Sequence, residues 1–386
     1  MENIEKIVKA ILEEVQKDGD KALLKFTRVF DGFSLTQKTL RIPEEALQES
    51  LNRVSVEFKQ AVLKVKKNIE TFQRRVLPKS WTITKNGVVL GEKYTPVESA
   101  GLYIPGGRFP YPSTVLMTAV PAKVAGVKRI AMVTPPGNVT HDVLATATMC
   151  GVTEVYSIGG AQAIAALAYG TETIPMVDMI VGPGNMYVAM AKKLVYGNVG
   201  IDSIAGPSEV IIIADDSVRS EYVVSDLMAQ AEHASGSEAL LLTRSKKLAD
   251  VVKLKIGRFP NVKIKVIKTM EEIIEFTNAR APEHVELLTR DARTLSKKIT
   301  NAGAIFIGYY SPTAVGDYYA GPSHVLPTGG TARFSSGLSS ADFMKHSSII
   351  EYTQKALGKA AQDIIALAER EGLKFHASSV IQRGKK

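Results

Sequence analysis

The first part of the chain is patterned for helices. Near the amino terminus, apolar residues recur every three or four positions, which predicts an amphipathic helix ending near Gly19. The residues of this apolar stripe are Ile4, Ile7, Val8, Ile11, Leu12 and Val15. An exposed stripe of this kind needs a partner surface. A second helical pattern begins at Pro43, which two acidic residues follow, and continues to about Val76.

Shorter apolar runs follow, with the spacing of strands. Residues 81–91 alternate around Asn86-Gly87, a dipeptide typical of a two-residue hairpin. From Gly101 onward, glycine-rich turns separate β-branched runs from alanine-rich helical stretches, which is the pattern of an α/β protein with mostly parallel sheets. Buried strands are predicted in two series, at residues 129–134, 154–158, 177–181 and 209–214, and then at 239–243, 262–267, 284–289 and 304–307.

These patterns predict an α/β protein with two Rossmann-like parallel-sheet domains and small N-terminal and C-terminal helical appendages. A chain of 386 residues is too long for one ordinary core. The predicted division has an N-terminal appendage at 1–20, a discontinuous first α/β domain at 21–102 and 209–338, a second α/β domain at 103–208, and a C-terminal tail at 339–386. Within that tail, a helix is predicted from about Thr353 to Glu371.

Composition excludes several classes of protein. No apolar run approaches the roughly 18 residues of a membrane span, and the mixed charges at the amino terminus do not form a leader sequence, so we expect a cytoplasmic location. The net charge of +9 comes mainly from lysines spread along the chain, which favours a solvated surface over a nucleic-acid site. Cys150 is the only cysteine, which excludes an internal disulfide and a cysteine-rich zinc cluster. Its apolar surroundings favour a buried, inert thiol over a nucleophile.

Candidate chemistry begins in the stretch SDLMAQAEH, where Gln230 and His233 lie three residues apart on one predicted helix face. Such a pair begins a metal site or decorates a polar helix surface, and spacing alone leaves both open. Zinc takes imidazole, carboxylate and, less often, amide oxygen when thiolates are absent. Asp317 in a loop-rich segment and His376 near the carboxyl terminus can complete such a set, although Asp is also a common turn residue. His324 lies in the same loop-rich segment.

Two further features can carry chemistry. Glu283 and His284 are adjacent at the start of a predicted strand, where neighbouring side chains diverge, so they are two proton-transfer groups for one cleft or polar residues of a turn. The glycine-rich turns GLYIPGG, SIGGAQA and VGPGNMY each follow a strand-like run, so their backbone amides can bind phosphates. None of the turns is a dinucleotide fingerprint or a phosphate-binding loop with Gly-Lys-Ser.

The motifs, in their order, resemble one family, the histidinol dehydrogenases, which are zinc enzymes that complete histidine biosynthesis. The matching stretches are GLYIPGG, IGGAQAIAALAYGT, VGPGNMYVAMAK, AGPSEV, DLMAQAEH, RAPEHVELL, GDYYAGPSHVLPT, SSADF and EGLKFHA, which span nearly the whole chain. Two stretches depart from the commoner family sequences: AGPSH, which ends at His324, and ASGSEA, which follows His233. Neither departure removes a ligand, and both bear on substrate discrimination.

The resemblance implies roles for particular residues. Glu283 and His284 match the acid/base pair. The matched zinc ligands, which also face the substrate, are Gln230, His233, Asp317 and His376. The other matched substrate contacts are Ser208, His324 and Glu371. The matched NAD contacts, all in the second α/β domain, are Tyr103, Gln162 and Asn185.

The resemblance also implies a reaction and an assembly. L-Histidinol is oxidised to L-histidine in two hydride transfers to NAD through bound L-histidinaldehyde, with one Zn²⁺ per chain. The tail at 339–386 crosses to the partner subunit, so the enzyme is a homodimer with a shared active site and has no nucleic-acid or membrane partner. Two alternatives stay open: a relative with the same machinery that acts on another amino or sulfonated alcohol, and a non-catalytic nucleotide-binding protein on the same fold.

Overall fold

The computed structural model describes residues 2–107, 109–232 and 236–384, and these form two compact units. The larger unit comprises Met1–Leu77 and Val97–Phe343, and the smaller unit comprises Pro78–Pro96 and Met344–Lys386. Two five-stranded sheets with parallel pairing lie in the larger unit, and a three-stranded antiparallel sheet lies in the smaller one. The predicted two-sheet α/β class is therefore confirmed.

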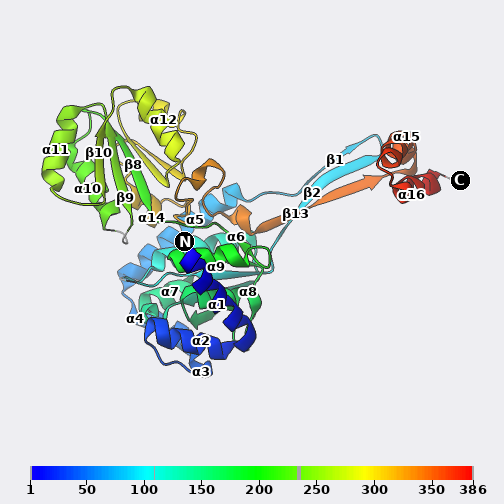
Figure 1. Ribbon diagram of the computed structural model, residues 1–386, viewed down its shortest axis with the longest axis horizontal. Coiled ribbons are helices and arrows are strands. Elements are labelled where there is room, and N and C mark those ends of the chain that lie inside the picture. The colour runs from blue at the N-terminus through cyan, green and yellow to red at the C-terminus, as the bar shows by residue number, and fades with distance from the viewer. Residues whose placement is uncertain (1, 108, 233–235, 385–386) are drawn as a thin grey trace. The chain divides into compact units, whose positions relative to one another are not determined.

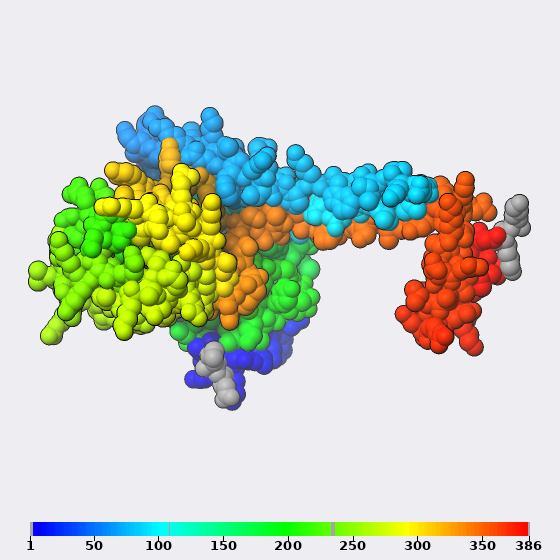
Figure 2. Space-filling view, turned by 90° about the horizontal axis from the view of Figure 1, so that it is seen from above, coloured from blue at the N-terminus to red at the C-terminus, as the bar shows by residue number. Residues whose placement is uncertain are grey.

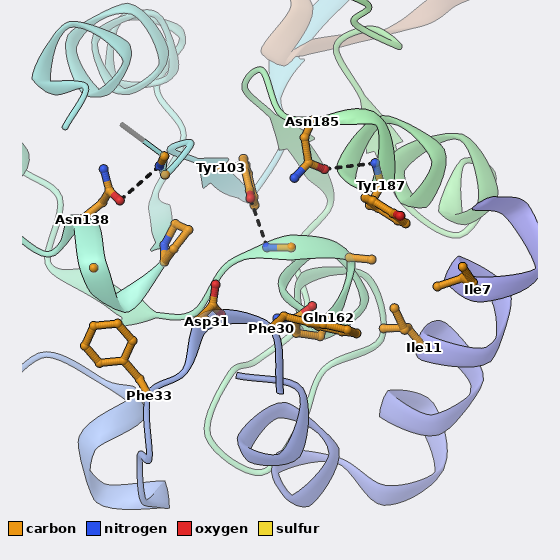
Figure 3. A pocket seen from close by; sticks show the side chains of 16 residues that line it. Ile7, Ile11, Phe30, Asp31, Phe33, Tyr103, Asn138, Gln162, Asn185 and Tyr187 are labelled. Carbon is orange, nitrogen blue, oxygen red and sulfur yellow. Dashed lines mark hydrogen bonds between the residues drawn. The ribbon is translucent and has the colours of Figure 1, made fainter. Parts of the chain in front are cut away.

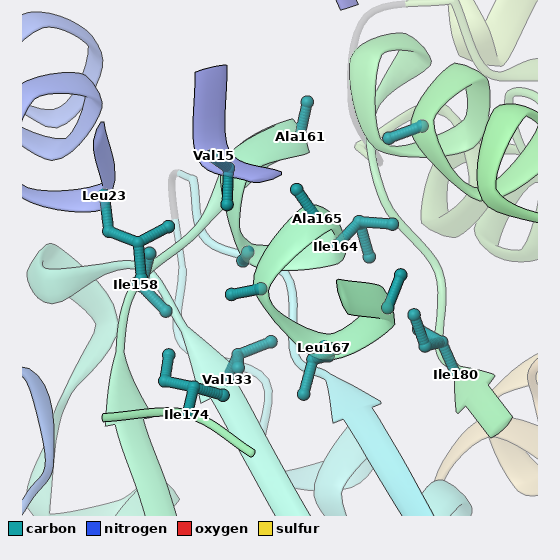
Figure 4. Packing of buried hydrophobic residues seen from close by; sticks show 14 of the residues in the cluster. Val15, Leu23, Val133, Ile158, Ala161, Ile164, Ala165, Leu167, Ile174 and Ile180 are labelled. Atoms are coloured by element: carbon teal, nitrogen blue, oxygen red, sulfur yellow. The ribbon is translucent and has the colours of Figure 1, made fainter. Parts of the chain in front are cut away.

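The first parallel sheet has the strand order β5-β4-β3-β6-β7. Its strands are β3 (Ser99–Tyr103), β4 (Arg129–Thr134), β5 (Glu154–Ser157), β6 (Met179–Val181) and β7 (Gly200–Ile201). The accompanying helices are α6 (Pro112–Ala125), η2 (Pro136–Asn138), α7 (His141–Met149), α8 (Gly160–Tyr169) and α9 (Met186–Val195). Alanine-rich α8 is almost wholly buried because small side chains let it pack between the strands and the N-terminal helices (Figure 4).

Most of the apolar stripe of the N-terminal helix α1 (Glu2–Asp18) lies in the core beside the first sheet, whereas Ile7 is 39% exposed. Val8 and Val15 are fully buried, and they belong to the same cluster as residues of α8 and α9. The stripe therefore finds the partner surface that it was predicted to need within its own chain. The stripe then gives no reason to expect a second subunit.

Five further helical segments follow α1 before strand β1. They are α2 (Asp20–Phe26), the π-helical turn η1 (Thr27–Asp31), α3 (Gln37–Leu40), α4 (Glu44–Arg53) and α5 (Val56–Val76). The predicted continuous helix from Pro43 to Val76 is wrong, because the chain turns extended at Val54 and starts again. The restart is capped by Ser55, whose side chain accepts a hydrogen bond from the Phe58 N–H at 3.1 Å.

The second parallel sheet has the order β10-β9-β8-β11-β12. Its strands are β8 (Glu209–Ala214), β9 (Glu238–Thr243), β10 (Val262–Val266), β11 (His284–Leu288) and β12 (Ala304–Ile307). Its helices are α10 (Ser220–Ala231), α11 (Lys246–Ile256), α12 (Met270–Arg280), α13 (Ala292–Ser296), α14 (Thr313–Tyr318), η3 (Thr331–Arg333) and η4 (Ser340–Phe343). All four strands of the second predicted series are present. Figure 1 labels two of them, β9 and β10, beside β8.

The smaller unit is built on a hairpin. Strands β1 (Trp81–Lys85) and β2 (Val88–Pro96) meet at the predicted turn, where Asn86 and Gly87 have positive φ of 55° and 82°. Strand β13 (Met344–Tyr352), which was not predicted, pairs along β2. Helices α15 (Gln354–Arg370) and α16 (Lys374–Gly384) follow and pack on each other, as Figure 2 shows in orange and red.

In the part of the chain that the structure describes, no helix has both the length and the apolar character needed to span a membrane. The four-part division predicted from the sequence stays a proposal. The parallel strands of both predicted α/β domains lie in the larger unit, whereas the hairpin predicted at residues 81–91 lies in the smaller unit.

Candidate active site

Glu283 and His284 lie at the amino end of the second sheet. Helix α12 ends at Ala281, whose left-handed φ of 48° turns the chain into β11, and His284 is the first residue of that strand. Both side chains are buried, and His284 Nδ1 is 3.6 Å from Glu283 Oε2. The expected divergence of the two side chains is therefore wrong, because Glu283 precedes the strand and does not follow its alternation.

The surroundings of His284 define its neutral tautomer. Its Nδ1 lies 3.2 Å from the backbone oxygen of Glu209, which can only accept, so Nδ1 carries the proton in the neutral ring. The other nitrogen, Nε2, is 4.0 Å from Asp317 Oδ1. The ring also packs against Phe306, with 5.9 Å between centroids. The arrangement presents Nε2 as the basic nitrogen on the Asp317 side.

A line of hydrogen bonds connects Gln230 to Glu283. The buried Gln230 donates through Nε2 to Ser208 Oγ at 2.9 Å, and the Ser208 side chain is hydrogen-bonded to Glu283. The Glu209 N–H also donates to Glu283 Oε2 at 3.0 Å. This use of Nε2 orients the amide so that its oxygen, the atom that binds cations, points away from Ser208.

Burial dominates the electrostatics of Glu283. It raises the pKa of this carboxyl from its ordinary value to about 7, although the hydrogen bonds from Ser208 and the Glu209 N–H act in the opposite direction. A carboxyl with a pKa near neutrality can both accept and return a proton at physiological pH. This property fits an acid/base group better than a structural turn residue.

A cavity of about 460 Å³ gathers three of the sequence-predicted residues, His284, Asp317 and His324. His324 contacts one helix from each sheet region. Its Nδ1 is 3.2 Å from the backbone oxygen of Asp317 on α14, and its Nε2 is 3.3 Å from Thr114 Oγ1 on α6. Asp317 itself is on α14, which opens after Pro312. His284 and two residues of the loop-rich segment thus line one cavity, whereas Glu283 is not among its lining residues.

The proposed metal ligands are only partly brought together. Gln230 and Asp317 lie in the larger unit, whereas His376 and Glu371 are exposed residues of the smaller unit. His233 lies outside the described residues. Among those that are described, no group of three His, Cys, Asp or Glu side chains is arranged to hold a metal ion. The amide oxygen of Gln230 and the carboxylate of Asp317 fit a zinc donor set but do not complete it.

A second cavity, of about 640 Å³, lies beside the first sheet and is lined by all three predicted cofactor contacts. Tyr103 ends β3, and its hydroxyl accepts a hydrogen bond from the Gly160 N–H at 3.0 Å (Figure 3). Asn185 caps α9, accepting from the Tyr187 N–H at 3.0 Å. The glycine-rich turns after β3, β5 and β6 therefore meet at one hollow, which is the size of a typical ligand cavity.

The most informative lining residue is Gln162. Its side chain is 1% exposed, and neither its amide nitrogen nor its amide oxygen has a hydrogen-bond partner among the described residues. A buried amide without partners costs free energy, so such a group calls for an explanation. A polar ligand in this cavity provides one, because it can pair with both amide atoms.

Sequence reasoning missed the N-terminal side of this cavity. The π-helical turn and the residues after it place Phe30, Asp31 and Phe33 in the lining (Figure 3). Asp31 has one carboxylate oxygen that is buried without a partner among described residues, and burial raises its pKa. The signal available was the pair of exposed aromatic residues around an Asp-Gly turn.

Cys150 is buried, as predicted. It is 3% exposed, and burial raises the pKa of its thiol to about 12. A thiol in this state does not ionise near neutral pH, which fits the inert alternative.

The fold and the two cavities define a two-sheet α/β protein with a ligand-sized cavity beside the first sheet and the buried Glu283 and His284 at the amino end of the second. The sequence model of the family described as histidinol dehydrogenase matches residues 1–384. A histidinol dehydrogenase of Thermosynechococcus vestitus is 51% identical over 97% of this chain and 91% of its own length. A histidinol dehydrogenase 2 of Trichormus variabilis is 49% identical over 98% of this chain and 92% of its own length. The chain belongs to the histidinol dehydrogenase family, a family of oxidoreductases.

Solved structures agree with this assignment. The crystal structure of a histidinol dehydrogenase from Elizabethkingia anophelis has a TM-score of 0.93 at 36% identity, covering 98% of this chain and 92% of that chain. A putative aldehyde dehydrogenase from Anabaena variabilis has a TM-score of 0.51 at 12% identity, covering 91% of this chain and 92% of that chain, and shows likeness of fold alone. The resemblance seen in the motifs is confirmed at the level of the family.

Proposed function

We propose that this chain is a zinc-dependent, NAD-linked dehydrogenase that oxidises L-histidinol to L-histidine through bound L-histidinaldehyde, the last step of histidine biosynthesis. The observation that carries the proposal is the continuous line from Gln230 through Ser208 to Glu283, beside His284 and Asp317. This line supports the proposal because it joins the amide of Gln230, a candidate metal donor, to Glu283, a candidate proton-transfer group beside His284. That combination suits an alcohol held at a metal while a neighbouring base removes its proton.

Zinc would be held by Gln230, His233, Asp317 and His376. Zinc is redox-inert, so when bound it supplies Lewis acidity and a fixed position for the substrate. The support for this set is the pairing of Gln230 Nε2 with Ser208, which leaves an amide oxygen as the donor, and the approach of Asp317 to His284. Ser208, His324 and Glu371 would contact the substrate.

His284 acts first in the proposed reaction. With Nδ1 held by the Glu209 carbonyl, its Nε2 would take the alcohol proton as the alcohol is oxidised to an aldehyde, with NAD, where bound, as the hydride acceptor. Glu283 then takes a proton from the water that adds to the aldehyde carbon. After releasing its first proton to solvent, His284 would take the hydroxyl proton of the hydrated aldehyde as that intermediate is oxidised. Overall, one alcohol, one water and two NAD⁺ would give one carboxylate, two NADH and three protons.

NAD would bind against the first sheet, with Tyr103, Gln162 and Asn185 as contacts. Bound there, it supplies a hydride acceptor. The partnerless amide of Gln162 supports this location, since a dinucleotide offers hydroxyl, phosphate and amide groups that pair with it. The three glycine-rich turns lack the usual dinucleotide fingerprint, which fits a binding mode in which all three turns together surround the ligand.

The proposal is tested by following NADH production from L-histidinol. We expect two NADH per histidinol, loss of turnover after exhaustive chelation, and recovery on adding zinc. Full activity after complete metal removal would overturn the zinc assignment. Turnover with a different amino alcohol or a sulfonated diol, and none with L-histidinol, would favour the alternative substrate within the same family.

A further inference from the structure

The cavity beside the first sheet has a single charged side chain among the described residues that line it, that of Asp31. Asp31 ends the π-helical turn η1, and Figure 3 shows its carboxyl directed into the cavity. One carboxyl oxygen, Oδ2, is buried and has no hydrogen-bond partner among the described residues. A carboxylate oxygen only accepts hydrogen bonds, so the group that would satisfy it is a hydrogen-bond donor.

The strands and turns of the first sheet supply no acidic residue near the first glycine-rich turn. In the common dinucleotide fold, an Asp or Glu about 20 residues after the glycine fingerprint accepts a hydrogen bond from a ribose 2′-hydroxyl. In this chain the turn GLYIPGG ends at Gly107, and the sequence has no Asp or Glu between Glu98 and Asp142. The carboxyl of Asp31 therefore reaches the cavity from the N-terminal helices, where the strand and helix repeat offers none.

Two aromatic residues accompany Asp31 in the lining of the cavity. Phe30 is 56% exposed and Phe33 is 43% exposed. The Phe33 ring lies beside Gly137, which follows β4, because a Cβ built on that glycine would be 3.8 Å from the ring. Exposed aromatic faces are suited to stacking on a flat base. The segment from Phe30 to Phe33 thus offers a base a stacking surface, and it offers the attached ribose a carboxylate.

Two separate groups of helices surround the first sheet, and they give the two halves of a dinucleotide different surroundings. Helix α6 packs with α5 and α7, and its Thr114 is 3.3 Å from His324 of the acid/base cavity. Helix α8 packs instead with α1, α2 and α9, and α2 leads into the turn that ends at Asp31. A nicotinamide has to approach His284, on the side of α6. The adenosine half is then left to the side on which Asp31 lies.

The electrostatics of the cavity favour a neutral sugar over a phosphorylated one. Burial raises the pKa of the Asp31 carboxyl, because its ionised form lacks stabilising partners. The described lining residues include no Lys, Arg or His. A ribose hydroxyl stabilises the carboxylate by donating a hydrogen bond to it. A phosphate on the same ribose carries negative charge and repels the carboxylate.

We propose that Asp31 is a specificity-determining residue, whose carboxylate binds the ribose hydroxyls of the adenosine half of NAD and excludes NADP, which has a phosphate at the ribose 2′ position. This inference rests on the proposed function, which places NAD in the cavity with Tyr103, Gln162 and Asn185. It adds the N-terminal segment to the three glycine-rich turns as a fourth part of the cofactor site. Asp31 contacts the cofactor and takes no part in proton or hydride transfer.

Two substitutions of Asp31 test this role. Asp31→Asn removes the charge and keeps one acceptor oxygen, whereas Asp31→Ser also makes room for a phosphate. Asp142→Asn is the matched control, because Asp142 is an exposed acid in the first turn of α7 that does not line the cavity. The dissociation constants of NAD and of NADP are measured on each full-length protein by calorimetric titration. Thermal unfolding of each protein without ligand measures its stability.

We expect the unmodified protein to bind NAD more tightly than NADP. Both Asp31 variants should bind NAD more weakly and NADP more tightly, so that the preference for NAD falls by about 10–100-fold. Their thermal midpoints should stay the same or rise, because Asp31 Oδ2 has no partner to lose among the described residues. Asp142→Asn should keep the preference of the unmodified protein.

An unchanged preference for NAD in both Asp31 variants would overturn the proposal, and so would an equal change in Asp142→Asn. These outcomes are distinct from failure of the proposed function. An unmodified protein that shows the expected dependence on Asp31 but does not oxidise L-histidinol would refute the assigned reaction and support the role of Asp31. An unmodified protein that binds neither dinucleotide would refute both.

Discussion

At the scale of single residues, the groups of chemical interest are two buried polar side chains, the amide of Gln162 and the carboxyl of Glu283. Motif matching identified Gln162 and Glu283 but gave no physical reason for either position. The structure adds the reason: the amide of Gln162 has no hydrogen-bond partner among the residues that the structure describes, and Glu283 has a pKa raised by burial. Neither property can be read from sequence, because burial depends on segments distant along the chain.

Replacing Gln162 with Leu should weaken NAD binding without weakening the fold. The substitution removes a buried amide that has no protein partner, so the free energy of unfolding should stay the same or rise. The lost hydrogen bonds to the ligand should raise the NAD dissociation constant by about tenfold, equivalent to ~1.4 kcal/mol. Calorimetric titration with NAD and thermal unfolding of the ligand-free protein measure the two effects.

Gln73→Leu serves as the matched control for that experiment. Gln73 is also fully buried, but its Oε1 accepts a hydrogen bond from the Ser340 N–H at 2.8 Å. Its replacement should cost about 1–3 kcal/mol of stability, because it leaves that N–H unpaired, and it should leave NAD affinity unchanged. Equal effects of the two substitutions on NAD binding would contradict the assigned role of Gln162.

The buried Glu286 of β11 makes the free energy of unfolding depend on pH in a predictable direction. Its pKa is raised from 4.5 to about 8, so between these values the folded chain holds a proton that the unfolded chain has released. Stability contributed by this proton is therefore complete below pH 4.5 and is lost as pH rises to about 8. Glu286→Gln removes that loss, so its melting temperature minus that of the unmodified protein should grow from pH 5 to pH 8. A constant difference would show that Glu286 is ionised in the folded chain.

At the scale of elements, local signals predicted most of the fold. The short apolar runs of β8, β11 and β12 and the Asn86-Gly87 turn were recognisable because each depends on neighbouring residues. Strand β13 was missed because its partner, β2, lies about 250 residues earlier. The break between α4 and α5 was missed because apolar spacing continues through it, and only the Ser55 cap marks the restart.

The third glycine-rich turn illustrates how an element is held for function. Lys192 on α9 and Asp202 form a buried ion pair. Both side chains also hold the backbone of Gly182. Lys192 Nζ donates a hydrogen bond to the Gly182 oxygen at 3.0 Å, and the Gly182 N–H donates one to Asp202 Oδ2 at 2.7 Å. Gly182 is required here, because a Cβ at this position would lie 2.2 Å from the backbone oxygen of Tyr103. The ion pair thus fixes the turn that leads to Asn185.

Lys192→Met should destabilise the protein by about 3–5 kcal/mol, because it leaves the Asp202 carboxylate buried without a counter-ion. Lys9→Met is the matched control, since Lys9 pairs with Glu5 on an exposed helix face and should cost less than about 0.5 kcal/mol. Urea unfolding of the three proteins measures the difference. A cost below 1 kcal/mol for Lys192→Met would mean that Asp202 is solvated or protonated.

At the scale of the whole molecule, the proposed site is assembled from segments that are far apart in the chain. Ser208, Glu283 and Asp317 meet within the larger unit, but Glu371 and His376 belong to the smaller one. The order of motifs was enough to nominate all of these residues. Sequence cannot say which copy of the chain supplies the last two, since the same motifs describe a site within one subunit and a site shared by two.

Mixing two inactive variants distinguishes these assemblies. His284→Asn should abolish proton transfer, and His376→Asn should remove a proposed zinc ligand. If His376 acts on the partner subunit, a mixed dimer has one site with both defects and one site with neither. Random reassociation makes about half of the dimers mixed, so the mixture should recover about a quarter of the activity of the unmodified protein.

If His376 instead acts within its own subunit, every site in the mixture has one defect and no activity returns. The two variants must therefore be unfolded and refolded together, with each refolded alone as the control. Light scattering of the unmodified protein gives the accompanying measurement, and a fully active monomer would exclude the shared site. Recovery of activity would identify residues 339–386 as the segment that makes the dimer necessary for turnover, because His376 has no function in the site of its own chain.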